Sequence, residues 1–175
     1  MASRVRRRME RSDSFRRGLV ALFMATAIFA PLLAATDAGA GTSRVGVVVN
    51  HGDGSVDTEC VKIRGDSIKT ITLLTRTSFD MYTQADPAYG RSICWLDGEG
   101  SHPSCFGDLQ GRSWNLYLRK KGQDEPKIAP VGASSLVVPA GGVLHALFDS
   151  WSEVDGTFVP PPAPDTVSLK TICEG

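Results

Sequence analysis

The sequence predicts an α+β fold in which a mixed sheet packs on one short helix. Stretches of alternating apolar and polar residues, typical of strands with one buried face, are separated by clusters of Gly, Asn, Asp and Pro. One stretch after Gly65 instead places Ile68, Ile71 and Leu74 at helical spacing. All four cysteines lie beyond the first forty residues, so disulfides can stabilise a body whose core is thin.

The first forty residues have the composition of an export signal. Seven arginines accompany an apolar run from Leu19 to Ala35, and Ala38-Gly39-Ala40 is a small-residue cleavage motif. We expect a signal peptide over residues 1–40 and a secreted, extracytoplasmic protein. The alternative is an uncleaved membrane anchor, since the run is close to the ~18 residues at which a span becomes possible. Arg16-Arg17 leaves twin-arginine export open beside the general secretory route.

The formal net charge of zero hides an acidic mature chain. Removing the leader leaves 12 of the 19 basic and 16 of the 19 acidic residues, a net charge of −4. The one basic run, Arg119-Lys120-Lys121, lies at the end of a predicted strand. Nucleic-acid binding depends on clustered Lys and Arg, so we expect no nucleic-acid partner.

The cysteines, Cys60, Cys94, Cys105 and Cys173, predict two disulfides, because an even number in an exported chain is typical of a disulfide framework. Three pairings are possible. The short intervening loop favours Cys94–Cys105, which leaves Cys60–Cys173. A zinc site is the alternative, but the paired short spacings of such sites are missing.

The body begins with a predicted hairpin. Val45–Val49 is a β-branched run, and Asn50–Gly54 is a turn because Asn and Gly tolerate positive φ. Val56–Ile63 forms the returning strand. Asp66 or Ser67 then caps a predicted short helix, whose threonines lower its propensity and which ends before Asp86-Pro87.

The remaining elements are extended pieces separated by turns and loops. We expect a tail after residue 151 that begins with a stiff proline-rich spacer and is tied back through Cys173 to Cys60. In chain order the segments are a strand at Ile93–Leu96, a turn at Asp97–Gly100, a strand at Trp114–Arg119, a polar loop at Gly122–Gly132, an extended run at Leu136–Val138, a last strand at Val143–Trp151, the spacer Pro160–Pro164 and an alternating piece at Thr166–Cys173.

This order of elements is that of a β-grasp (ubiquitin-like) domain over residues 44–151, followed by the tail of residues 152–175. The same region resembles a bacterial secreted domain of unknown function that is similar to the C-terminal domain of transcobalamin and intrinsic factor. The residues that carry the resemblance are Val47–Val49 with the Gly52-Asp53-Gly54 turn, Ser92–Gly98, Ser113–Tyr117 and Pro139–Val143.

In the vitamin carriers such a domain closes over cobalamin held against a helical barrel, and the 135 residues after the leader leave no room for such a barrel. In bacteria similar domains occur as exported modules, alone or attached to other proteins. The resemblance therefore implies binding or interaction rather than chemistry.

Aromatic side chains around the Cys94–Cys105 loop are the candidate binding residues. They could stack on a flat ligand or a sugar ring; the alternative is that Trp95, Trp114 and Tyr117 belong to the core. The predicted ligand-binding residues are Trp95, Asp97, Phe106, Trp114 and Tyr117.

Acidic residues and a histidine in the same loop could act as acid–base groups or metal ligands. Asp-Gly and Glu-Gly pairs are also what turns use. The three histidines lack metal-ligand spacing, and the serines lack a Gly-x-Ser-x-Gly elbow. We therefore predict no metal and no cofactor. The loop residues concerned are Asp97, Glu99, His102 and Asp108.

Together these features predict a secreted, non-catalytic binding module. Its partner would be a protein, a glycan or a small flat ligand, and it would meet a membrane only through an uncleaved signal segment. Two alternatives remain: an extracytoplasmic hydrolase that uses the loop carboxylates, and a structural component attached to a surface assembly by disulfides.

Overall fold

The computed structural model describes residues 42–175 except 88–89, 104 and 106–110. The predicted signal peptide and the residues Phe106 and Asp108 therefore lie outside the described residues. Within the described part, no helix has the length and apolar character needed to cross a membrane.

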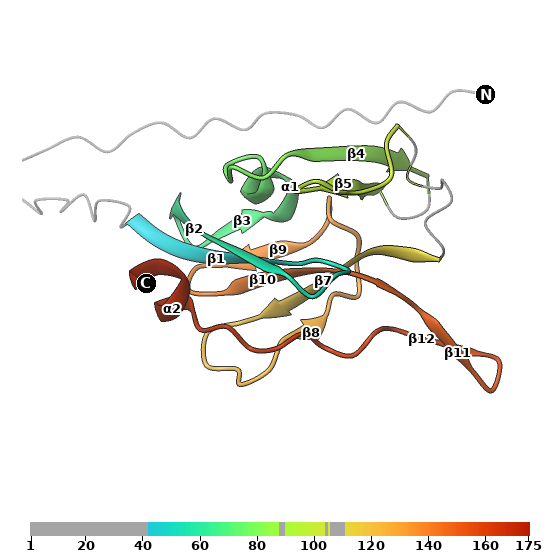
Figure 1. Cartoon of the computed structure of the whole chain (residues 1–175). Helices are drawn as coiled ribbons and strands as arrows, with labels where there is room; N and C mark the ends of the chain where they lie inside the picture. Colours follow the sequence, from blue (N-terminus) through green and yellow to red (C-terminus); the bar gives the residue numbers. More distant parts are fainter. Residues whose placement is uncertain (1–41, 88–89, 104, 106–110) are drawn as a thin grey trace, which may run out of the picture. The chain divides into compact units, whose positions relative to one another are not determined.

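A five-stranded mixed sheet forms the centre of the domain (Figure 1). β1 (Thr42–Asn50) pairs in parallel with β10 (Val143–Ser150), with Val47 opposite Leu144, and the other pairings in the sheet are antiparallel. The predicted mixed sheet with a short helix is thus confirmed. In spatial order the strands are β2 (Val56–Arg64), β1 (Thr42–Asn50), β10 (Val143–Ser150), β7 (Arg112–Arg119) and β8 (Lys127–Ile128).

The front face of this sheet carries the hydrophobic core. Val47, Leu144 and Leu116 lie on it, and Ile63 and Val61 of β2 are buried on the same side, as the alternation predicts. Small elements cover it. These are α1 (Thr70–Leu74), the pair β3 (Ser67–Lys69) and β9 (Val137–Pro139), and the second sheet β4 (Met81–Asp86), β5 (Gly90–Leu96) and β6 (Glu99–Gly100).

The back face of the sheet carries Gly46, Tyr117 and His145 and is covered by the C-terminal segment, residues 160–175. The Tyr117 hydroxyl donates a hydrogen bond to the carbonyl oxygen of Pro161. A Cβ atom on Gly46 would lie 2.7 Å from Cδ1 of Ile172, so the helix α2 (Leu169–Glu174) packs directly on β1. Before this segment, β11 (Ser152–Val154) and β12 (Thr157–Val159) form a separate hairpin.

Both predicted disulfides are present, with Cα–Cα distances of 5.0 Å for Cys60–Cys173 and 4.3 Å for Cys94–Cys105. The first joins β2 to α2 and ties the C-terminal segment to the back face. The second links β5 to the loop after β6. The two bonds favour an oxidising environment for the folded protein.

The predicted helix cap is wrong. Ser67 and Ile68 belong to β3. The helix begins after Lys69, which makes no side-chain capping hydrogen bond, and it is five residues long. Pairing of β3 with β9 outweighs the local capping preference. The predicted tie of the tail to Cys60 is present, but the predicted alternating piece at Thr166–Cys173 is wrong. Leu169–Glu174 is helical, because the Ser168 side chain accepts a hydrogen bond from the Thr171 N–H and caps it.

Candidate functional site

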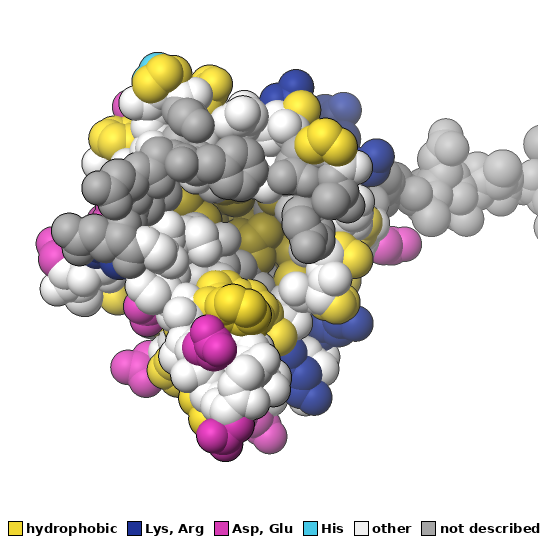
Figure 2. Space-filling view, turned by 90° about the vertical axis from the view of Figure 1, so that its right-hand side faces the viewer, with side chains coloured by type: hydrophobic (Ala, Val, Ile, Leu, Met, Phe, Trp, Pro, Cys, Tyr) yellow, Lys and Arg dark blue, Asp and Glu magenta, His cyan; other side chains and the backbone are white. Residues whose placement is uncertain are grey.

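A groove of about 590 Å³ lies between the edges of β5 and β7. Among the described residues, each of these edges is paired with another strand over only part of its length. On one side β7 pairs with β8 only at Tyr117 and Leu118. On the other side β5 pairs with β6 only at Trp95 and Leu96. Figure 2 shows the face on which the groove opens, a hollow with hydrophobic side chains at its base. Its principal side chains are Arg91, Ile93, Arg112, Trp114, Leu116 and Trp151.

The indole ring of Trp151 is held in place by the buried amide of Asn115. The Asn115 side chain donates to the carbonyl oxygens of Ser113 (2.9 Å) and Asp149 (3.0 Å). Its oxygen accepts a hydrogen bond from Trp151 Nε1 at 2.5 Å. Trp151 is still 43% exposed. A large exposed ring with a fixed orientation is a preorganised contact surface, because little side-chain entropy is lost when a ligand packs against it.

Trp114 connects the groove to the core. Its ring packs on Phe148 with a centroid separation of 5.1 Å, and its Nε1 donates to the carbonyl oxygen of Glu99 at 3.4 Å. The guanidinium of Arg112 lies over the same Phe148 ring, 4.8 Å from its centroid, a cation–π geometry. The wall of the groove formed by Trp114 and Arg112 is therefore supported from behind.

Beside Trp114, a histidine is surrounded by three carboxylates. His51 follows β1, Asp57 lies in β2, and Asp97 and Glu99 belong to the β5–β6 hairpin. Nε2 of His51 is 3.2 Å from Asp57 Oδ2 and 3.4 Å from Asp97 Oδ2, and Nδ1 is 3.2 Å from Glu99 Oε2. The ring meets Trp114 edge-on with centroids 6.2 Å apart.

Glu99 is fixed by two further contacts. It accepts a hydrogen bond from the Gly52 N–H at 2.9 Å, and its other oxygen lies 3.8 Å from Arg112 Nη1. With Nδ1 protonated toward Glu99, Nε2 is free to act as an acceptor or a metal ligand. His51, Asp57 and Asp97 could then hold a cation, since their ligand atoms lie within 4.8 Å of one another.

The structure separates the predicted binding residues. Trp114 lines the groove, and Asp97 lies in the histidine cluster rather than in the groove. Trp95 is half-buried in β5, opposite Tyr82. Tyr117 is 2% exposed on the back face, where burial and then the Asp149 carboxylate raise the pKa of its phenol. Among the described residues, Trp95, Trp114 and Tyr117 therefore do not form a single aromatic surface around the Cys94–Cys105 loop.

Two groups of contacts were not predicted from the sequence. His51 and Asp57 come from the first hairpin, and no local spacing relates them to Asp97, some forty residues later. Trp151 faces the groove because Asn115 holds it, and that contact spans 36 residues. Both depend on the sheet topology.

Comparisons with known proteins do not define a family. No family model matches the chain. The chain is 30% identical over 118 residues to the serine–tRNA ligase of Pelobacter propionicus, an alignment that covers 60% of this chain and only 27% of the ligase. It is also similar to a solved structure described as "a putative metal binding protein" from Ruminococcus gnavus ATCC 29149, with 17% identity, a TM-score of 0.45, and coverage of 62% of this chain and 97% of the other.

Proposed function

We propose that this protein is an extracytoplasmic, non-catalytic binding module with a β-grasp type of domain, exported by means of residues 1–40. The observation that carries the proposal is the groove beside β7, where Trp151 and Trp114 face a hollow of about 590 Å³. That volume is within the range of small-molecule sites, about 300–1,000 Å³. The two disulfides support the extracytoplasmic location.

The chemistry of the groove favours a flat, ring-bearing ligand with an anionic group. Trp114 and Trp151 offer ring faces and edges, and Ile93 and Leu116 add apolar surface. Arg91 and Arg112 also line the hollow, and a guanidinium can pair with a carboxylate, sulfonate or phosphate. A glycan or a peptide that carries such groups would use the same contacts.

Titration with 8-anilinonaphthalene-1-sulfonate, a flat aromatic sulfonate, tests this proposal. We expect saturable fluorescence enhancement by the folded protein, and about tenfold weaker binding by Trp151→Ala, because an aromatic contact in a preformed site is worth about 1 kcal/mol or more.

Phe158→Ala is the matched control, since Phe158 is 70% exposed in β12 and does not line the groove. Equal affinities for the wild type, Trp151→Ala and Phe158→Ala would contradict the proposal. Circular dichroism of each variant checks that the fold is retained.

A second candidate function is supported by the histidine cluster: binding of a divalent transition-metal ion. The specific observation is that Nε2 of His51 faces two carboxylates while Glu99 occupies Nδ1, as in carboxylate–histidine–metal arrangements. One imidazole and two carboxylates suit Zn²⁺ better than Ca²⁺, which prefers six to eight oxygen ligands.

Calorimetric titration with ZnCl₂ tests the metal proposal. His51→Gln should abolish binding, and Glu99→Gln should weaken it about tenfold, because loss of an orienting carboxylate commonly costs 10–100-fold. Asp165→Asn, an exposed carboxylate of the C-terminal segment, is the control and should bind like the wild type. Zinc affinity that His51→Gln leaves unchanged would contradict this second proposal.

The disulfide-attached alternative would need one of the internal bonds to open, since all four cysteines are paired in the two described disulfides. The hydrolase alternative depends on Asp108, which lies outside the described residues, paired with Asp97. Asp97 instead contacts His51.

A further inference from the structure

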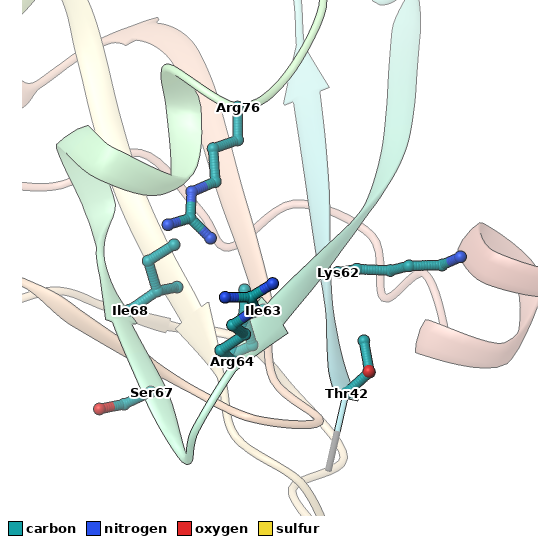
Figure 3. A pocket seen from close by; sticks show the side chains of 7 residues that line it. All are labelled: Thr42, Lys62, Ile63, Arg64, Ser67, Ile68 and Arg76. Carbon is teal, nitrogen blue, oxygen red and sulfur yellow. The ribbon is translucent and has the colours of Figure 1, made fainter. Parts of the chain in front are cut away.

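A second hollow, of about 440 Å³, lies where β2 ends and the chain turns into β3. It shares no lining residue with the groove. Figure 3 shows its seven lining residues: Thr42, Lys62, Ile63, Arg64, Ser67, Ile68 and Arg76. Three of them are cationic and none is acidic. The hollow is therefore positively charged, whereas the cluster around His51 contains three carboxylates.

Two of the cations reach toward each other across the hollow. Arg64 comes from the end of β2 and Arg76 from the turn after α1, and their guanidinium groups approach above Ile63 and Ile68 (Figure 3). The Lys62 side chain points away, toward α2. The floor is apolar and nearly closed to solvent, with Ile63 2% and Ile68 8% exposed.

Neither guanidinium has a partner among the described residues. The described ion pairs all involve His51 or Glu99, and Asp66 in the intervening turn makes none. Arg91 and Arg119 differ from them in this respect. Arg91 donates to Thr83 Oγ1 at 2.9 Å, and Arg119 donates to the carbonyl oxygens of Gln123 and Val167.

Two guanidinium groups directed into one hollow repel each other. An anion between them would be attracted by both, and this attraction would outweigh the repulsion. Guanidinium groups present planar pairs of N–H donors that match the oxygens of phosphate and sulfate. We propose that Arg64 and Arg76 bind a phosphate or sulfate group in this hollow, as a separate ligand site from the groove. Lys62 adds long-range attraction without touching the ligand.

NMR titration of the ¹⁵N-labelled protein with inorganic phosphate at constant ionic strength tests this site. We expect saturable shifts of the Ser67, Ile68 and Arg76 amides. Arg64→Gln and Arg76→Gln should each weaken binding about tenfold, the loss expected when one charged hydrogen-bond donor is removed. Arg44→Gln is the matched control, since Arg44 is an exposed arginine of β1, opposite Lys62 in the sheet, and does not line the hollow.

Equal weakening by Arg44→Gln and Arg64→Gln would overturn the proposal, because it would mean general attraction rather than a site. No saturable shift with phosphate or sulfate would overturn it as well. Parallel titrations with sulfate and glycerol 3-phosphate identify the source of the group: tighter binding of the monoester indicates a phosphorylated molecule, and tighter binding of an inorganic ion indicates the free ion. Both results support the site.

Discussion

Large side chains are buried on the back face of the sheet but partly exposed at the groove beside β7. On the back face, Tyr117 and His145 are closed off beneath the C-terminal segment, with 2% and 0% of their surface exposed. Trp114 of β7 and Trp151, which follows β10, instead remain partly open to the groove. The closed side is tied by Cys60–Cys173, while the open side has a strand edge without a partner strand over much of its length among the described residues.

This difference indicates which side serves the structure and which is available to a ligand. His145 is buried with neither ring nitrogen hydrogen-bonded among the described residues, a cost that the fold tolerates where the C-terminal segment excludes water. Trp151, in contrast, has its indole N–H satisfied and its ring exposed. Energetic effects should therefore be large on the back face and small at the groove.

The largest effect is expected from removing the disulfide of the back face. Cys60→Ala/Cys173→Ala opens a link between residues 113 apart, whereas Cys94→Ala/Cys105→Ala opens one of 11. Loop-closure entropy predicts losses of about 4–5 and about 2–3 kcal/mol in the free energy of unfolding. Urea denaturation of both variants measures the two losses. An equal or reversed order would show that the C-terminal segment adds little to stability.

The next effect concerns pH and His145. Burial, followed by the positive charge of Arg119, lowers the pKa of His145 to about 4 in the folded protein, below about 6.5 in the unfolded chain. The unfolded state therefore binds the proton more readily, so stability is fully present above pH ~6.5 and is lost as the pH falls toward 4. The loss amounts to about 3 kcal/mol.

His145→Leu provides the comparison for this pH dependence. Denaturation midpoints between pH 7 and 4 should fall less steeply for His145→Leu than for the wild type, since the carboxylates contribute equally to both. Parallel pH profiles would mean that water reaches the imidazole, and that the back face is not closed.

A smaller effect is expected from Tyr117→Phe. The substitution removes the hydroxyl that donates to the Pro161 carbonyl and leaves that buried acceptor without its partner. We expect a loss of about 1–2 kcal/mol by thermal or chemical denaturation. An unchanged stability would indicate that the C-terminal segment does not depend on this contact.

The smallest effect is expected at the groove. Trp151→Phe keeps a ring but removes the N–H that donates to Asn115 Oδ1. Because the site is exposed, we expect a stability change of about 1 kcal/mol or less, together with weaker binding of the anilinonaphthalene probe. A loss larger than that of Tyr117→Phe would contradict the assignment of structural and binding roles to the two sides.

Local patterns predicted part of this fold. The hairpin of β1 and β2 and the Cys94–Cys105 bond follow from turn residues and short spacing. Cys60–Cys173 followed by exclusion. Local patterns do not predict the six-residue helix α2, because its only local signal is the Ser168 cap. They predict helix rather than strand at β3, because the pairing of β3 with β9 is non-local.

The candidate sites were harder to predict, because they depend on which strands become neighbours. Trp114 was predicted as a binding residue from its place next to the disulfide loop. His51 contacts Asp97 only because the first hairpin lies beside the β5–β6 hairpin. Arg64 and Arg76 come from different elements and line one hollow only in the folded domain.

NMR mapping of the anilinonaphthalene probe on the intact, oxidised protein tests the contrast between the two sides most directly. The account predicts shifted amides along Arg91–Ile93 and Arg112–Leu116, with Val48 and His145 unaffected. Shifts concentrated on Val48, Tyr117 and His145, or no saturable shifts at all, would contradict it.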